Sequence, residues 1–315
     1  MIAGSGGPGA SDLAWTHLLA AAREDRDLVR VRDLLRLCET VIVRAGLSGF
    51  NSMGSARKDA NALVYETLAI RDHSARYLDA IVTTPERTAI LDLLERRVSG
   101  PTPVPYLTGE AFFAGRRFGV RPGVFIPRSA LGTLLDEVLA AISWSTTARV
   151  LELGCGSGAL GLSIAIRMPA VRIDLLDIDP VAIDVTDDNI ARHQLTGRAS
   201  AAVSDMYDAV DPTARYDLIV ANLPYVPHEL TRSSNVEILA EPQHAVYRPG
   251  DGLDLVRIAI DEAALHLSDL GTLVLEVGTS NEAAVRDLIP GRGHWWERDG
   301  QTAGVVSLTR DELKA

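Results

Sequence analysis

The chain has 315 residues, 47% of them hydrophobic, and a formal net charge of −11 at neutral pH. This length suits one large domain with a smaller one and allows a sizeable core. The negative charge argues against a protein that binds through many phosphate contacts. No run of about 18 apolar residues occurs, so we expect no membrane-spanning helix.

The first residues and the cysteines bear on the compartment. Residues 1–11 are rich in glycine and lack the apolar segment of a signal peptide. Cys38 and Cys155 are the only cysteines, one in a predicted helix and one in a glycine-rich loop, so we expect no disulfide framework. We therefore predict a disordered leader over residues 1–11 and a cytoplasmic protein.

Helical spacing dominates residues 12–99. Apolar residues recur at intervals of three and four: Leu28, Val31, Leu34, Leu35, Cys38, Leu63, Val64, Leu68, Ile90, Leu91, Leu94 and Val98. Thr84 followed by Pro85 is typical of a helix start, with the threonine as the cap. A break at Gly100-Pro101-Thr102-Pro103 ends the pattern. We predict a small helical domain over residues 12–99, which either contacts a substrate or serves only as a packing cap.

Strands and helices alternate after this break. The strand candidates are residues 150–153, 173–177, 201–204, 218–221 and 272–277, with a late strand over residues 304–309. Residues 180–193 and 253–267 have helical patterns. This alternation predicts an α/β domain over residues 100–315, in which helices cover both faces of a mostly parallel sheet. Residues 100–148 form a lead-in segment before its first strand.

A glycine-rich loop joins the first strand to the first helix of this domain. The strand Arg149-Val150-Leu151-Glu152-Leu153 runs into Gly154-Cys155-Gly156-Ser157-Gly158, whose glycines let the backbone approach a ligand closely. About 20 residues later Asp177 ends the next strand, where a ribose diol is held in such folds, with Asp179 as a near competitor. A dinucleotide site looks similar, but the glycine spacing differs, and Glu152 would repel a pyrophosphate.

A second motif, Asn222-Leu223-Pro224-Tyr225, follows the apolar run of residues 216–221. The Asn222 side-chain oxygen and the Leu223 carbonyl can both accept hydrogen bonds from one NH2 group. Pro224 restricts the backbone, and the Tyr225 ring offers a flat face to a planar substrate group. We therefore predict that these four residues are catalytic and that the modified atom is an amide or aromatic amino nitrogen.

Together these motifs resemble those of the class I methyltransferases that use S-adenosylmethionine. Further segments resemble the HemK-type protein-(glutamine) methyltransferase family: residues 103–110, 118–120, 125–129, 250–255 and 273–278. Pro127-Arg128-Ser129 is closer to the branch that modifies a large-subunit ribosomal protein than to the release-factor branch. The resemblance implies a Rossmann-like, mostly parallel sheet with a small N-terminal helical domain that recognises the substrate.

The resemblance also implies a cofactor site. Asp205 corresponds to a carboxylate at the adenine edge, Met206 packs on the adenine ring, and Phe125 and Arg128 line the pocket. The full set expected to bind S-adenosylmethionine is Phe125, Arg128, Glu152, Gly154, Cys155, Gly156, Gly158, Asp177, Ile178, Asp205, Met206 and Asn222. No spacing of histidines, cysteines and carboxylates indicates a metal site, so we expect none.

Leu223 departs from the family, which usually has proline there. The backbone carbonyl is kept, so amino-nitrogen chemistry is still expected, but the substrate stays open. The first hypothesis is methylation of a glutamine side chain in a ribosomal protein or release factor. The second is methylation of a small specialised metabolite or an RNA base, and the third is a binding module that no longer transfers methyl. The acidic charge favours a basic protein over nucleic acid as partner, and no membrane partner is expected.

Overall fold

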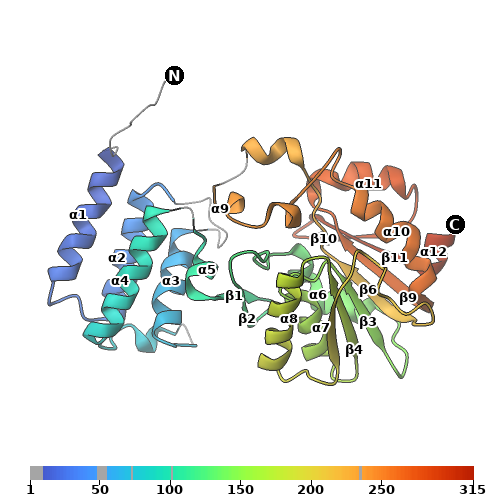
Figure 1. Cartoon of the computed structure of the whole chain (residues 1–315), viewed down its shortest axis with the longest axis horizontal. Helices are drawn as coiled ribbons and strands as arrows, with labels where there is room; N and C mark the ends of the chain where they lie inside the picture. The colour runs from blue at the N-terminus through green and yellow to red at the C-terminus, as the bar shows by residue number, and fades with distance from the viewer. Residues whose placement is uncertain (1–9, 48–54, 72–73, 101, 234–235) are drawn as a thin grey trace. The chain divides into compact units, whose positions relative to one another are not determined.

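The computed structural model describes residues 10–47, 55–71, 74–100, 102–233 and 236–315, which form two compact units (Figure 1). The first, here called the helical unit, comprises Met1–Gly109 and Asn235–Ala240; the second, the sheet unit, comprises Glu110–Ser234 and Glu241–Ala315. This division lies later than the break expected near residue 100. The expected leader lies outside the described residues except for positions 10 and 11, which begin a helix. In the described ranges no helix is long and apolar enough to cross a membrane.

Short amphipathic helices build the helical unit. Its helices are α1 Ala10–Glu24, α2 Val31–Arg44, α3 Ala56–Thr67, α4 Thr84–Ser99, α5 Val104–Thr108 and α9 Val236–Leu239, with a 3-10 turn at Ala75–Tyr77. Helix α4 is capped by Thr83, one residue before the threonine predicted from the sequence, because the Glu86 carboxylate reaches back to the N–H and hydroxyl of Thr83 at 2.8 and 2.6 Å.

A buried arginine lies in the core of the helical unit. The Arg97 side chain on α4 is fully buried, on a helix whose Ile90, Leu91 and Leu94 belong to the apolar core of this unit. Its Nε donates to Asp59 on α3 at 3.0 Å, and its guanidinium pairs with Glu237 on α9. Because a buried cation needs charged partners, this cluster holds a segment from late in the chain within the helical unit.

The described residues of the sheet unit contain a seven-stranded sheet in the order β10-β11-β9-β6-β3-β4-β5. Its strands are β3 Arg149–Leu153, β4 Arg172–Asp177, β5 Ala199–Val203, β6 Tyr216–Ala221, β9 Leu267–Glu276, β10 His294–Arg298 and β11 Gln301–Thr309. Five strands pair in parallel, and β11 and β10 close the sheet as an antiparallel hairpin. The predicted α/β fold is confirmed.

Helices cover both faces of this sheet (Figure 1). One face packs against α6 Ala130–Ala141, α7 Ala159–Arg167 and α8 Pro180–Arg192, and the other against α10 Asp254–His266, α11 Glu282–Leu288 and α12 Arg310–Lys314. The hairpin of β1 Glu110–Phe113 and β2 Arg116–Gly119 precedes α6. The remaining elements are β7 Val226–Pro227 paired with β8 Tyr247–Arg248, and 3-10 turns at His228–Ser233, Gln243–Ala245 and Thr279–Asn281.

The register of three central strands decides where the sequence motifs meet. Leu153 at the end of β3 pairs with Leu176 of β4 and with Ala221 of β6. The chain order reverses between β3 and β6, which is the switch point where ligands bind in doubly wound sheets. The glycine loop, Asp177 and Asn222 therefore leave the sheet side by side.

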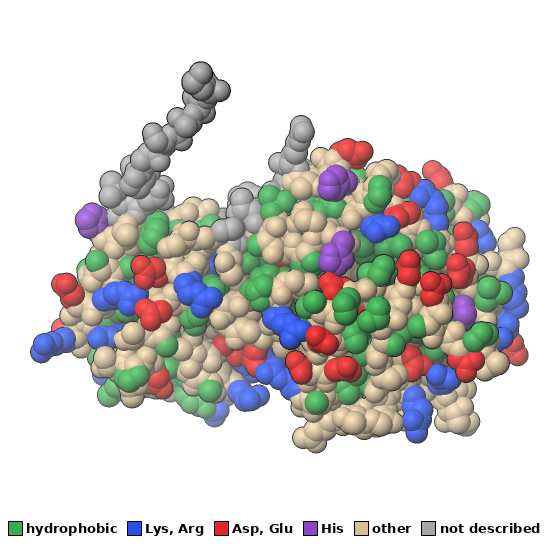
Figure 2. Space-filling view, in the orientation of Figure 1, with side chains coloured by type: hydrophobic (Ala, Val, Ile, Leu, Met, Phe, Trp, Pro, Cys, Tyr) green, Lys and Arg blue, Asp and Glu red, His purple; other side chains and the backbone are tan. Residues whose placement is uncertain are grey.

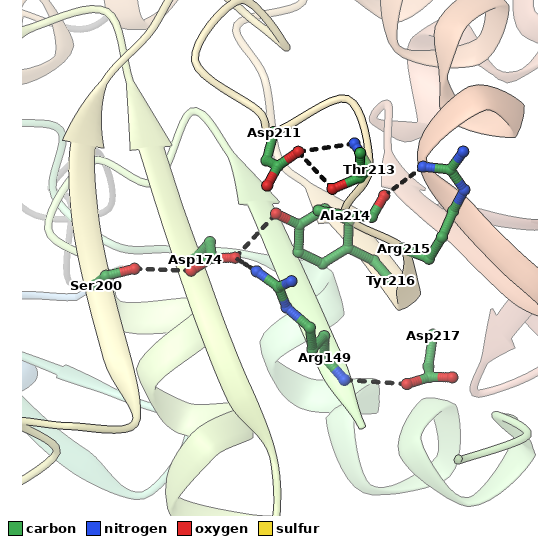
Figure 3. Close-up of polar contacts among 9 residues, drawn as sticks. All are labelled: Arg149, Asp174, Ser200, Asp211, Thr213, Ala214, Arg215, Tyr216 and Asp217. Atoms are coloured by element: carbon green, nitrogen blue, oxygen red, sulfur yellow. Dashed lines mark hydrogen bonds and ion pairs between the residues drawn. The ribbon is translucent and has the colours of Figure 1, made fainter. Parts of the chain in front are cut away.

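The opposite, amino-terminal ends of these strands are held by a polar network (Figure 3). Asp174 accepts from Arg149 at 2.7 Å, from the Tyr216 hydroxyl at 2.9 Å and from the Ser200 hydroxyl at 2.7 Å. Asp217 is buried and accepts from the Arg149 backbone N–H at 3.0 Å. These bonds link β3, β4, β5 and β6 and therefore stabilise the strand register on which the site depends.

Asp217→Ala is expected to lower the free energy of unfolding by about 3 kcal/mol, because it removes a buried acceptor from several donors. The carboxylate accepts from the Ser145 hydroxyl at 2.9 Å and the Ser268 hydroxyl at 3.2 Å, besides the Arg149 N–H. Urea unfolding measures the change. The control, Asp211→Ala, removes an exposed carboxylate bonded locally to Thr213 and should cost less than about 1 kcal/mol. Equal effects of the two substitutions would contradict the argument.

Candidate functional site

A cavity of about 670 Å³ lies at the carboxyl ends of the central strands, entirely within the sheet unit. The structure brings together most of the residues predicted for the site. Those that line the cavity are Phe125, Arg128, Glu152, Gly154, Cys155, Gly156, Asp177, Ile178, Asp205, Met206, Asn222, Leu223 and Pro224. Gly158 and Tyr225 do not line it.

The glycine loop forms one wall of the cavity. Gly154, Gly156 and Gly158 have φ values of +66°, +56° and +72°, which side-chain-bearing residues rarely adopt. A Cβ on Gly156 would meet no atom within 4 Å, so a ligand can approach this backbone closely. Gly158 is the N-cap residue of α7 and does not line the cavity. A Cβ at this position would lie 2.9 Å from the Thr186 side chain. The third glycine therefore shapes the loop from behind.

Two carboxyl groups, the buried Glu152 and the partly buried Asp177, lie beside this loop. Glu152 accepts from the Gly161 N–H at 2.9 Å, and Asp177 accepts from the Gly156 N–H at 2.8 Å and the Asp179 N–H at 2.9 Å. Burial raises the pKa of both carboxyl groups, although these backbone donors act in the opposite sense. A cationic ligand would favour their ionised forms, whereas a pyrophosphate would be repelled. These two carboxylates fit S-adenosylmethionine, because its sulfonium is positively charged and its ribose diol can donate hydrogen bonds to them.

Asn222 follows β6 directly and faces the lead-in segment. Its Nδ2 lies 3.5 Å from the carbonyl oxygen of Arg128, a long hydrogen bond. Because a carbonyl can only accept, the NH2 group must face Arg128 and the side-chain oxygen must point the other way. Leu223 is 4% exposed and packs in the core cluster next to the loop, where a Cβ on Gly154 would lie 3.0 Å from its side chain. The Leu223 side chain therefore packs against the glycine loop at Gly154.

Tyr225 supports the cavity wall from outside. A Cβ on Gly278 would lie 2.8 Å from its ring, and its backbone carbonyl accepts from Asn281 at 3.0 Å. A Cβ on Gly252 would lie 2.5 Å from that same carbonyl oxygen, so the chain needs glycine there. Burial raises the pKa of the Tyr225 hydroxyl to about 12. The Tyr225 ring packs against the apolar core of the sheet unit. Its packing and the hydrogen bond from Asn281 position the last residue of the tetrad.

Several cavity residues were not assigned from the sequence. They include Pro127, Ser129, Asp179, Ser204, His244, Arg248 and Asp254. Asp179 pairs with His244 at 3.3 Å, and Asp254 holds Arg248 through two side-chain nitrogens. Asp179 had a sequence signal as the competitor of Asp177. Pro127, Ser129 and Asp254 lie in the segments 125–129 and 250–255 that resemble the family. His244 and Arg248 come from a region after the tetrad in which no pattern indicates a site.

The fold and this site define a class I methyltransferase that uses S-adenosylmethionine. Residues 117–275 match the methyltransferase small domain family. The ribosomal protein uL3 glutamine methyltransferase of Bordetella pertussis is 35% identical, over 91% of this chain and 97% of its own length. The protein of the same name from Burkholderia pseudomallei is 36% identical, over 81% and 85%. The chain therefore belongs to the family of the ribosomal protein uL3 glutamine methyltransferases.

Among solved structures, a methyltransferase from Pyrococcus furiosus matches with a TM-score of 0.42 and 13% identity, covering 61% of this chain and 88% of that one. The predicted membership of the protein-glutamine methyltransferases is confirmed by the curated relatives. The protein is an S-adenosylmethionine-dependent N-methyltransferase.

Proposed function

We propose that this enzyme methylates the side-chain amide nitrogen of a glutamine in ribosomal protein uL3, the substrate that the names of its relatives state. The observation that carries the proposal is the orientation of Asn222. Asn222 lines the cavity, and its NH2 group faces the Arg128 carbonyl at 3.5 Å, which leaves its oxygen as the acceptor for a ligand. An oxygen acceptor suits a substrate that presents an NH2 group, as a glutamine side chain does.

Two acceptors orient the substrate nitrogen in this proposal. The Asn222 oxygen and the Leu223 carbonyl each accept one N–H of the glutamine amide, which turns the nitrogen lone pair toward the methyl donor. The same bonds favour the positive charge that develops on nitrogen as its conjugation with the carbonyl is lost. Pro224 restricts the backbone of this motif. The Tyr225 carbonyl, which accepts a hydrogen bond from Asn281, holds the end of the motif in place.

The cofactor, when bound, supplies a methyl group already activated on a positively charged sulfur. The methyl group would pass from that sulfur to the amide nitrogen, with the S–C electron pair staying on a then neutral sulfur, and the nitrogen would lose one of its protons to solvent. No general base is required, because a protonated amide nitrogen is strongly acidic. The residues of this chain therefore contribute alignment and electrostatic stabilisation rather than proton transfer.

The roles of the cofactor-binding residues belong to the same proposal. The backbone of Gly154, Cys155 and Gly156 approaches the amino-acid part, and Asp177 accepts from the ribose hydroxyls. Ile178, Asp205 and Met206 surround the adenine. Phe125, Arg128 and Glu152 complete the cavity wall. Gly158 contributes only through the shape of the loop.

The charge of the chain supports a basic protein partner. The net charge is −11, and on the face shown in Figure 2 basic side chains lie singly among acidic ones. A ribosomal protein is a basic partner, whereas naked nucleic acid would be repelled. We assign recognition of the ribosomal protein substrate to the helical unit. A release factor is the next protein acceptor to test.

The test incubates the purified enzyme with labelled S-adenosylmethionine and separated protein, RNA and small-molecule fractions of a host lysate. Label in uL3, mapped by mass spectrometry to a glutamine side chain, is the expected result. Label only in RNA or small molecules would overturn the proposal. In that case Leu223→Pro becomes the first variant to assay, because Leu223 is the departure from the family tetrad.

Cofactor affinity is expected to fall as the pH is lowered, because Asp177 must be ionised to accept from both ribose hydroxyls. Burial raises the pKa of Asp177 above its ordinary value of 3.8, so ionisation is lost at a higher pH than for an exposed aspartate. Below that pKa the affinity should drop by up to roughly tenfold per pH unit. Calorimetric Kd values from about pH 8 down to about pH 4, close to the ordinary pKa of an aspartate, measure the slope.

Asp177→Asn is the control, and it should bind more weakly with a flatter pH profile. Since the folded pKa lies above the unfolded one, the cofactor-free protein gains stability from Asp177 as the pH falls through the same window. Affinity and stability should therefore change in opposite directions. A wild-type slope equal to that of Asp177→Asn would contradict the ribose role.

A further inference from the structure

A five-residue stretch of the sheet unit, Phe125-Ile126-Pro127-Arg128-Ser129, is here called the lead-in loop. It precedes α6 and contributes four of its five residues to the cavity lining, all except Ile126. The Arg128 guanidinium lies 4.3 Å from the centre of the Phe125 ring, a cation–π contact. This loop also supplies the carbonyl that faces the Asn222 NH2 group.

Glu241 holds the middle of the lead-in loop. Its side chain is fully buried, with no exposed surface. One carboxylate oxygen accepts from the Ile126 N–H at 3.0 Å, and the other accepts from the Arg128 guanidinium at 2.6 Å. These contacts lie on both sides of Pro127, so a single carboxylate positions the backbone that leads to the Arg128 carbonyl.

Glu276 at the end of β9 holds the far end of the loop. It accepts from the Ser129 hydroxyl and from the Leu131 N–H, the latter at 2.9 Å. Its side chain is buried as well. The loop is thus tied at two points by buried carboxylates that come from distant parts of the chain. Only Glu241 binds Arg128 itself, whose carbonyl faces Asn222, whereas Glu276 binds residues that follow it.

The contact between Arg128 and Asn222 is the weak member of this chain of interactions. At 3.5 Å it is close to the limit of a hydrogen bond. A small displacement of the Arg128 carbonyl would release the NH2 group, and the Asn222 amide could then rotate. A rotated amide would present NH2 to the substrate NH2, where two donors face each other.

We propose that Glu241 is a positioning residue for methyl transfer. By clamping Ile126 and Arg128, it keeps the Arg128 carbonyl against the Asn222 NH2 group and the Asn222 oxygen toward the acceptor amide. The inference rests on the role proposed above for Asn222. It goes beyond that role because Glu241 acts through the lead-in loop and is not itself in contact with the reacting atoms.

A double-mutant cycle tests this coupling. Glu241→Gln is expected to lower kcat roughly ten- to a hundredfold in the wild-type background, but by less than about threefold in the Asn222→Ala background. Equal losses in both backgrounds would overturn the proposal, as would an unchanged kcat. Glu282→Gln is the matched control, because it breaks the ion pair with Arg286 within α11, outside the cavity lining, and should leave kcat unchanged.

A second measurement does not depend on the acceptor. The chain has six asparagines, so selective labelling with 15N-asparagine yields six side-chain NH2 groups, and the Asn222 group is assigned by its loss in Asn222→Ala. In the cofactor-bound enzyme, Glu241→Gln should speed exchange of these Asn222 protons with water, whereas Glu282→Gln should not. Identical exchange in wild type and Glu241→Gln would overturn the proposal.

The two measurements separate this inference from the proposed function. If wild type transfers no methyl to uL3, the function fails while the exchange experiment still decides the role of Glu241. If Glu241→Gln does not fold, Glu241→Asp replaces it. The shorter carboxylate keeps its charge, and it must show the same non-additivity with Asn222→Ala, at a smaller loss of kcat, for the proposal to stand.

Discussion

Asn222→Ala is expected to lower kcat by about two to three orders of magnitude, while changing the Kd of S-adenosylmethionine by less than about threefold. The substitution removes the oxygen that accepts from the substrate amide, and the bond it makes strengthens as charge develops on nitrogen. The glycine loop and Asp177 keep their own contacts in the variant. Turnover with saturating cofactor and calorimetric Kd values measure the two effects separately.

The matched variant is Asn222→Asp, which keeps the oxygen but replaces NH2 by a second acceptor. That acceptor would face the Arg128 carbonyl, so the side chain should lose its fixed orientation and kcat should fall as well. An aspartate that kept wild-type turnover would refute the argument from orientation. If the Kd of S-adenosylmethionine rose in Asn222→Ala by the same factor as kcat fell, Asn222 would instead be a cofactor-binding residue.

Arg97→Ala is expected to lower the free energy of unfolding by about 3–5 kcal/mol. The arginine is fully buried between the carboxylates of Asp59 and Glu237, which belong to the same unit. Its removal takes the cation from between two buried carboxylates, which then repel each other in a medium of low polarity. Denaturant unfolding followed by circular dichroism measures the change.

The helical unit itself supplies the control. Arg23 also pairs with two carboxylates, Asp92 at 2.8 Å and Glu95 at 2.7 Å, but all three side chains are exposed to solvent. Arg23→Ala should therefore cost less than about 1 kcal/mol. A triple replacement of Arg97, Asp59 and Glu237 by apolar residues of similar size should restore most of the lost stability. Similar losses for Arg97→Ala and Arg23→Ala would contradict the explanation.

Local patterns predicted the strands of the α/β fold correctly, because each strand depends on neighbouring residues. The runs that became β3, β4 and β6 are rich in apolar residues, and the glycine loop is recognisable from its spacing. The cap of α4 was misplaced by one residue, since two adjacent threonines compete for it and the reach of Glu86 decides between them.

The sequence by itself determined the α/β class, because strand and helix patterns follow from contiguous residues. Together with the family resemblance it predicted the methyl-donor site and the amino-nitrogen role proposed for the Asn222 motif. Only the tertiary structure decided that Tyr225 packs behind the cavity wall and that Leu223 supports the glycine loop. It also decided the pairing of Arg97 with Glu237 across 140 positions and of Arg128 with Glu241 across 113. Such contacts depend on how the chain returns through space, and no local periodicity records which distant charge will be buried beside another.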